Sequence, residues 1–278
     1  MTSTFILANM NVVVSILPEQ TFVKKIGGDK VNVSLMVLPG NSPHTYEPKP
    51  SQMKNIAKAS LYFAIGVEFE NIWLEKFKNL NRNMIVIDLT KDIEKINMAS
   101  HHHEHDSHKE EAHHEHSSKD PHIWTSPKNV KVIAKNIYLS LAENDPENGL
   151  YYKANYENFI EEINILDSKI KNILSKKKSN SKFMVFHPSW GYFARDYNLK
   201  QLAIELEGKT PKPKELIMLI KEAKEENISA IFTQPEFSDE VSKVMANELK
   251  IEVIKVSPLA KNWEENLLNI SNAIAGNH

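Results

Sequence analysis

The sequence contains no cysteine, very little arginine and no long apolar segment. Without cysteine, the chain cannot form disulfides, thiolate zinc sites, thiol nucleophiles or a lipid anchor on an N-terminal cysteine. Arg82 and Arg195 are the only arginines, so few bidentate phosphate clamps can be built. No apolar run reaches the roughly 20 residues that a membrane span requires. We therefore expect no direct membrane insertion.

Charge and composition are those of an ordinary globular protein. The 278 residues are 41% apolar and 25% charged, and the formal net charge is -2, which gives no indication of a nucleic-acid partner. The opening MTSTFILANMN has a short apolar piece but no basic segment before it. We expect a mature or nearly mature chain whose export signal is absent or truncated.

Short apolar, β-branched runs predict buried parallel strands that alternate with helices. The runs fall in two groups, 11–17, 31–38, 61–66 and 83–89 before the middle of the chain, and 182–187, 228–233 and 251–257 after it. Stretches with helical spacing separate them. This alternation predicts an α/β fold with two lobes, each a parallel sheet flanked by helices.

The region between the two groups predicts one long connecting helix. Ser126-Pro127 and Asp145-Pro146 each combine a cap residue with proline at the first helical position. After Pro146, apolar residues recur every three to four positions as far as a lysine cluster. We predict an N-terminal lobe at 1–145, a rigid connecting helix at 146–178 and a C-terminal lobe at 179–278.

A histidine-rich segment interrupts the first lobe. Residues 101–116 read HHHEHDSHKEEAHHEH, and imidazoles and carboxylates at such short spacing bind divalent metals. The segment lacks apolar periodicity, so we expect a disordered loop over about 99–119 that binds several ions weakly. It indicates that the protein handles metal, and a specific site must lie elsewhere.

Three histidines outside the loop are candidate metal ligands, whereas the terminal His278 has no informative surroundings. His44 follows the strand predicted at 31–38, and His187 ends the strand predicted at 182–187, where ligands bind in open α/β sheets. His122 stands in DPHIWTSP, just after the loop. A proline lies next to each of them and restricts the backbone there.

Four segments together resemble a known family. PGNSPHTYEPKPSQ, DPHIWTSP, FHPSWGYFARDYNL and TQPEFS are similar to the periplasmic metal-binding proteins that serve zinc and manganese ABC transporters, the cluster A-I solute-binding proteins. The resemblance runs from about Val12 to Asn272, and the histidine-rich insertion is typical of the zinc-specific branch. It implies two lobes joined by one long helix, with the metal at the interface.

The resemblance also implies the site and the partners. His44, His122 and His187 match the family's three histidine ligands for Zn(II). The function implied is capture of zinc in the periplasm by a monomer and its delivery to a membrane permease. Relatives often carry an aspartate where this chain has Ser257, so the fourth ligand is water, Glu236 or a histidine of the loop.

We also predict the roles of aromatic and acidic residues near the three histidines. We expect Trp190, Tyr192 and Phe193 to pack around the site, and Glu47 to support a ligand. Glu205 and Glu207 are expected at the surface.

Several alternatives stay open. Three histidines and a water form the catalytic site of some zinc hydrolases, but the sequence contains no H-E-x-x-H or G-x-S-x-G motif, so we expect no enzyme. Transport of manganese or another divalent metal is a second alternative, although Mn²⁺ prefers oxygen ligands. Adhesion and zinc storage are further roles that the sequence leaves open.

Overall fold

The computed structural model describes residues 9–98, 119–205 and 209–276. The chain divides into two compact units, and each is described by itself. Unit 1 comprises Met1–Ile93, Pro127–Asp167 and Leu259–Trp263, and unit 2 comprises Glu94–Ser126, Ser168–Pro258 and Glu264–His278. The predicted histidine-rich loop and the export-signal remnant lie outside the described residues, as does Glu207.

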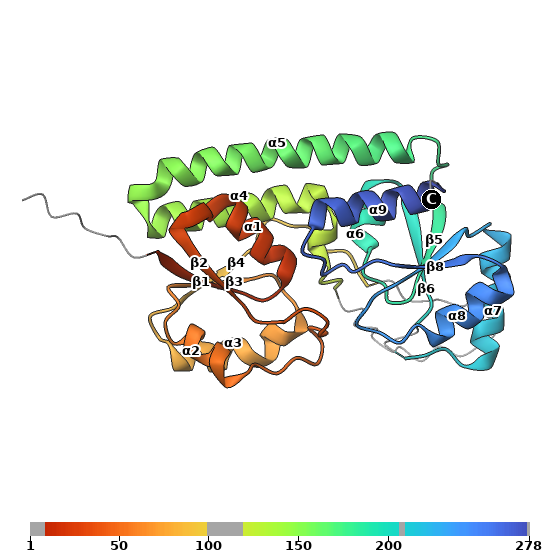
Figure 1. The fold of residues 1–278 in the computed structure, drawn as a ribbon, viewed down its shortest axis with the longest axis horizontal. Coiled ribbons are helices and arrows are strands. Elements are labelled where there is room, and N and C mark those ends of the chain that lie inside the picture. Colours follow the sequence, from red (N-terminus) through yellow and green to blue (C-terminus); the bar gives the residue numbers. More distant parts are fainter. Residues whose placement is uncertain (1–8, 99–118, 206–208, 277–278) are drawn as a thin grey trace, which may run out of the picture. The chain divides into compact units, whose positions relative to one another are not determined.

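Unit 1 is built on a parallel sheet with the strand order β2-β1-β3-β4. Its strands are β1 (Met10–Val14), β2 (Val31–Leu35), β3 (Leu61–Ala64) and β4 (Ile85–Asp88). Helices α1 (Leu17–Gly27) and α4 (Pro127–Asn144) cover one face, and α2 (Pro50–Ile56) and α3 (Glu68–Leu80) cover the other (Figure 1). Pro50 and Pro127 are the first residues of their helices, where the missing N–H costs nothing.

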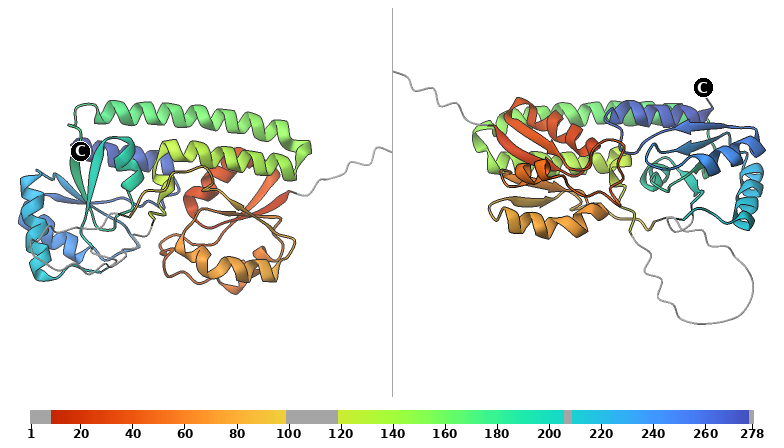
Figure 2. Two further views of the ribbon diagram at one scale, coloured as in Figure 1. Left: turned by 180° about the vertical axis from the view of Figure 1, so that it is seen from behind. Right: turned by 60° about the horizontal axis from the view of Figure 1, so that its bottom comes forward.

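Unit 2 repeats this plan with the parallel strand order β6-β5-β7-β8. Its strands are β5 (Ser181–Val185), β6 (Leu199–Ala203), β7 (Ala230–Thr233) and β8 (Glu252–Lys255). Helices α7 (Pro213–Glu225) and α8 (Glu240–Leu249) cover one face, where they pack on Met184, Leu202 and Ile231. Helices α6 (Gly191–Asp196) and α9 (Trp263–Ala275) lie on the other face (Figure 2).

The long helix of the middle region is α5 (Gly149–Leu174), a continuous helix of 26 residues. A short 3-10 turn, Pro146–Asn148, precedes it. The part of α5 up to Asp167 is grouped with unit 1, and the part from Ser168 is grouped with unit 2. The segment that carries His122 is grouped with unit 2, and the lobe boundaries at 145 and 178 stay a prediction.

The α/β class with two helix-flanked parallel sheets is confirmed, but one strand was missed. The sequence predicted three strands after residue 180, and the structure has a fourth, β6, at the edge of the sheet. Its sequence LKQLA has two adjacent polar residues and no β-branched residue, so it does not resemble a buried strand. Within the described residues, no helix has both the length and the apolarity needed to cross a membrane.

A buried polar network lies at the carboxyl ends of β1 and β3. Ser15 Oγ donates to Glu70 Oε1 at 2.5 Å, and the Glu70 carboxylate also accepts the N–H groups of Ile65 and Gly66 at 2.9 and 2.7 Å. Glu19, which is fully buried nearby, accepts the N–H of Ser15 at 2.8 Å. Burial raises the pKa of Glu70 to about 7 and raises that of Glu19 well above its ordinary value.

Candidate metal centre

His187 lies two residues beyond the end of β5, one of the two inner strands of the sheet in unit 2. The β5–β6 ladder ends with Val185 opposite Ala203, and its continuation by two residues sets His187 opposite Glu205. The β5–β7 ladder pairs Val185 with Phe232, and the same continuation sets His187 opposite Gln234. Parallel register thus brings two polar side chains to His187 from the two neighbouring strands.

Both neighbours contact His187. Glu205 Oε1 lies 2.6 Å from the ring Nδ1, and Gln234 Nε2 donates to the backbone carbonyl of His187 at 3.0 Å. The Phe237 ring stacks on the imidazole with centroids 5.0 Å apart and an interplanar angle of 22°. Side chain, backbone and ring face of His187 are therefore all restrained.

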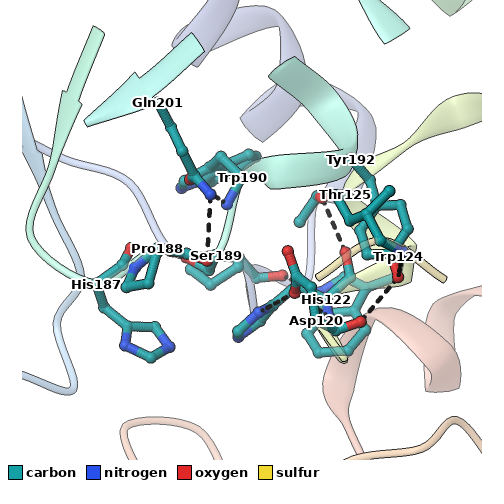
Figure 3. Close-up of polar contacts among 12 residues, drawn as sticks. Asp120, His122, Trp124, Thr125, His187, Pro188, Ser189, Trp190, Tyr192 and Gln201 are labelled. Carbon is teal, nitrogen blue, oxygen red and sulfur yellow. Dashed lines mark hydrogen bonds and ion pairs between the residues drawn. The ribbon is translucent and has the colours of Figure 1, made fainter. Parts of the chain in front are cut away.

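His122 is held by its own turn. The backbone N–H of His122 donates to Asp120 Oδ1 at 2.9 Å, and the ring Nδ1 lies 2.8 Å from the same oxygen. Thr125, in the 3-10 turn Ile123–Thr125, donates its hydroxyl to the His122 carbonyl at 2.9 Å. Figure 3 shows Asp120 and His122 side by side, with Thr125 and Tyr192 next to them.

Asp120 is itself enclosed. Its side chain is fully buried, and the Tyr192 hydroxyl donates to the Asp120 carbonyl at 2.8 Å. Burial, with the Asp120 charge nearby, raises the pKa of Tyr192 to about 12, so the phenol keeps its proton and remains a donor. Gly191 leaves room for the carboxylate, because a Cβ there would lie 2.6 Å from Asp120 Oδ2.

The two histidines form a close pair within unit 2. Their ring centroids are 5.2 Å apart at an interplanar angle of 74°, and they are 5% and 7% exposed. Each Nδ1 lies within hydrogen-bond distance of a carboxylate oxygen, and a carboxylate that accepts an Nδ1–H bond leaves the lone pair on Nε2. A neutral imidazole with this arrangement is the usual protein ligand of zinc.

His44 also lies beside a carboxylate, within unit 1. It lies in the irregular segment between β2 and α2, and its Nδ1 is 3.1 Å from Glu68 Oε2. Glu68 is the first residue of α3. The sequence prediction had assigned a supporting role to Glu47, which is exposed; the carboxylate beside His44 is Glu68, which follows the end of β3 and could have been considered for that reason.

Glu205 was wrongly predicted at the surface, since it is only 7% exposed and contacts His187. The signal that could have revealed it was β6, the strand that the sequence prediction missed. Burial of Trp190, Tyr192 and Phe193 is confirmed, because none of the three has measurable exposure.

A further polar pair is formed by Ser257 and Glu236. Ser257 Oγ donates to Glu236 Oε1 at 3.1 Å. Both side chains are half-buried. Glu236 immediately precedes Phe237, the residue stacked on the His187 ring.

Comparison with known families gives a match over nearly the whole chain. Residues 12–275 match the family described as "Zinc-uptake complex component A periplasmic". The chain belongs to this family. Its members are substrate-binding components of transport systems, which confirms the expectation that the chain is not an enzyme.

Individual relatives agree with the family match. The high-affinity zinc uptake system protein ZnuA of Bacillus subtilis is 31% identical over 258 residues, covering 88% of this chain and 77% of that protein. The zinc-binding protein AdcA of Streptococcus pyogenes serotype M6 is 30% identical over 265 residues, covering 90% of this chain and 50% of AdcA. The chain thus spans about half the length of the AdcA proteins it matches.

A solved structure shows the same fold. A crystal structure of ZnuA superposes with a TM-score of 0.87 at 43% identity, covering 96% of this chain and 98% of the other. The prediction of a zinc-uptake solute-binding protein, made from four short segments, is therefore confirmed at the level of the family.

Proposed function

We propose that this chain captures Zn(II) in the periplasm and delivers it to the permease of an ABC transporter. The observation that carries the proposal is the pair His122 and His187, whose rings are 5.2 Å apart and whose Nδ1 atoms both contact carboxylates. The family description and the relatives named for zinc uptake support it.

In this proposal three imidazoles bind the ion. His122 and His187 come from unit 2, and His44, whose Nδ1 is paired with Glu68, comes from unit 1. Zinc suits three neutral nitrogen ligands. The permease would then recognise the zinc-loaded form of a monomer.

Manganese transport is the alternative within the same family resemblance. The resemblance implies that the manganese members carry a carboxylate at the position of His187, and Mn²⁺ prefers the harder oxygen ligands. The donor set proposed here therefore favours zinc.

Growth of the source bacterium under metal limitation tests the proposal. We expect deletion of the gene for this chain to slow growth in zinc-depleted medium, and added zinc to restore it. The wild-type gene should restore growth as well, whereas a gene encoding His187→Ala should not. Restoration by manganese alone, or full rescue by His187→Ala, would refute the assignment.

A further inference from the structure

We propose that Glu205 is a positioning residue for zinc: it holds His187 as the tautomer protonated on Nδ1, so that Nε2 presents its lone pair to the metal. This inference rests on the proposed function, because it assigns a further residue to the same site. It concerns contacts within unit 2 only.

The fold brings Glu205 to this position by strand register. The backbone N–H of Glu205 donates to the Phe186 carbonyl at 3.1 Å, which extends the β5–β6 pairing to the residue before His187. From this position the Glu205 side chain reaches the His187 ring, and Glu205 Oε1 lies 2.6 Å from Nδ1. Both side chains are less than a tenth exposed, so water competes little for this hydrogen bond.

The other contacts of His187 restrain it differently. Gln234 binds the backbone carbonyl at 3.0 Å, and Phe237 stacks on the ring face. Neither contact depends on which ring nitrogen carries the proton. Of these three contacts, only the one with Glu205 distinguishes Nδ1 from Nε2.

A choice of tautomer matters for metal binding. A neutral imidazole can carry its proton on either nitrogen, and only the Nδ1–H form offers the Nε2 lone pair. A carboxylate that accepts the Nδ1–H bond also makes Nε2 a better donor to the metal. Loss of such a partner typically lowers metal affinity 10- to 100-fold.

The first measurement uses metal-free protein and does not depend on zinc transport. In ¹⁵N-labelled wild-type protein at about pH 8, above the ordinary pKa of imidazole, long-range ¹H–¹⁵N correlation spectra should show His187 as the Nδ1–H tautomer. Glu205→Met keeps the side-chain length and removes the carboxylate. We expect this variant to populate both tautomers of His187.

The second measurement is zinc affinity by chelator competition. Glu205→Met should bind zinc about 10- to 100-fold more weakly than wild type. Glu205→Gln, whose amide can donate as well as accept, should show a smaller loss and carries the test if the methionine variant fails to fold. Glu252→Met, at an exposed position of β8, is the matched control and should bind like wild type.

Two results would overturn the inference. One is an unchanged His187 tautomer in the folded Glu205 variants. The other is zinc affinity within twofold of wild type in both variants. If the wild-type protein itself failed to bind zinc, the proposed function would fail, yet the tautomer spectra would still decide whether Glu205 holds His187.

Discussion

His122 and His187 come from distant parts of the sequence, yet their rings lie 5.2 Å apart and nearly perpendicular to each other, at 74°. Each ring is fixed by a carboxylate within the same unit, His122 by Asp120 and His187 by Glu205. Local contacts within unit 2 therefore fix the orientation of both rings.

Asp120→Asn should weaken zinc binding about 10-fold, the lower end of the usual loss for such a partner. The asparagine can still accept the backbone N–H of His122, but its amide can also turn an N–H toward the ring, which removes the preference for the Nδ1–H tautomer. Chelator competition with purified protein measures the loss. Asp29→Asn, at a largely exposed side chain, should leave the affinity unchanged; equal affinities for all three proteins would contradict this role of Asp120.

Gly191→Ala should destabilise unit 2 by about 1–3 kcal/mol, the usual cost of overpacking. The added Cβ would lie 2.6 Å from Asp120 Oδ2 and 3.1 Å from Ile96 Cδ1. Chemical unfolding of the metal-free protein measures the change. Gly149→Ala is the control, because its Cβ would meet only Ala142, at 3.9 Å, and alanine suits a helix better than glycine does. A Gly191→Ala protein as stable as wild type would show that Asp120 can move aside.

Glu236 is predicted to supply the fourth ligand in place of the aspartate that relatives often have at position 257. Ser257 holds its carboxylate at 3.1 Å, and the next residue, Phe237, contacts the His187 ring. Substitution of cobalt for zinc makes the coordination visible in the absorption spectrum. Glu236→Gln should change that spectrum and lower the zinc affinity, whereas deletion of residues 101–116 should change neither. The opposite pattern would assign the fourth position to a histidine of the deleted segment.

Glu70 should make the stability of unit 1 depend on pH. Its pKa is raised to about 7 by burial, so between about pH 4.5 and pH 7 the folded state keeps a proton that the unfolded state has lost. The free energy of unfolding therefore falls as pH rises through this range, by on the order of 3 kcal/mol, and levels off above it.

Glu70→Gln should remove most of this slope, whatever its effect on absolute stability. Urea unfolding of metal-free wild type and variant between pH 4.5 and 8 measures it, and the difference between the two proteins cancels the titration of the histidines. Glu75→Gln, at an exposed site of the same helix, should keep the wild-type slope. Parallel curves for wild type and Glu70→Gln would show that Glu70 ionises normally.

The sequence predicted those parts of the fold that depend on local pattern. Apolar runs located β1, β3, β5 and β7, and proline next to a cap residue marked the start of α4. The edge strand β6 was missed because LKQLA has neither a long apolar run nor strict alternation. β6 forms because it pairs with β5. Since β5 is not adjacent in the sequence, the local pattern around LKQLA does not indicate a strand.

The site was predicted less completely than the fold, because most of its contacts join residues that are distant in the sequence. The three histidines stand out beside prolines and at strand ends, whereas their carboxylate partners do not. Glu205 reaches His187 through the register of a strand pair, and Glu68 reaches His44 from the start of a helix. Asp120 lies nearest in sequence to its histidine, two residues before His122.

The most direct test of the central claim is equilibrium zinc binding by wild type, His187→Ala and a variant lacking residues 101–116, each stripped of metal beforehand. We predict that wild type and the deletion variant bind one zinc ion with similar high affinity, and that His187→Ala loses on the order of 100-fold or more. Loss of tight binding in the deletion variant, with wild-type affinity retained by His187→Ala, would contradict the account.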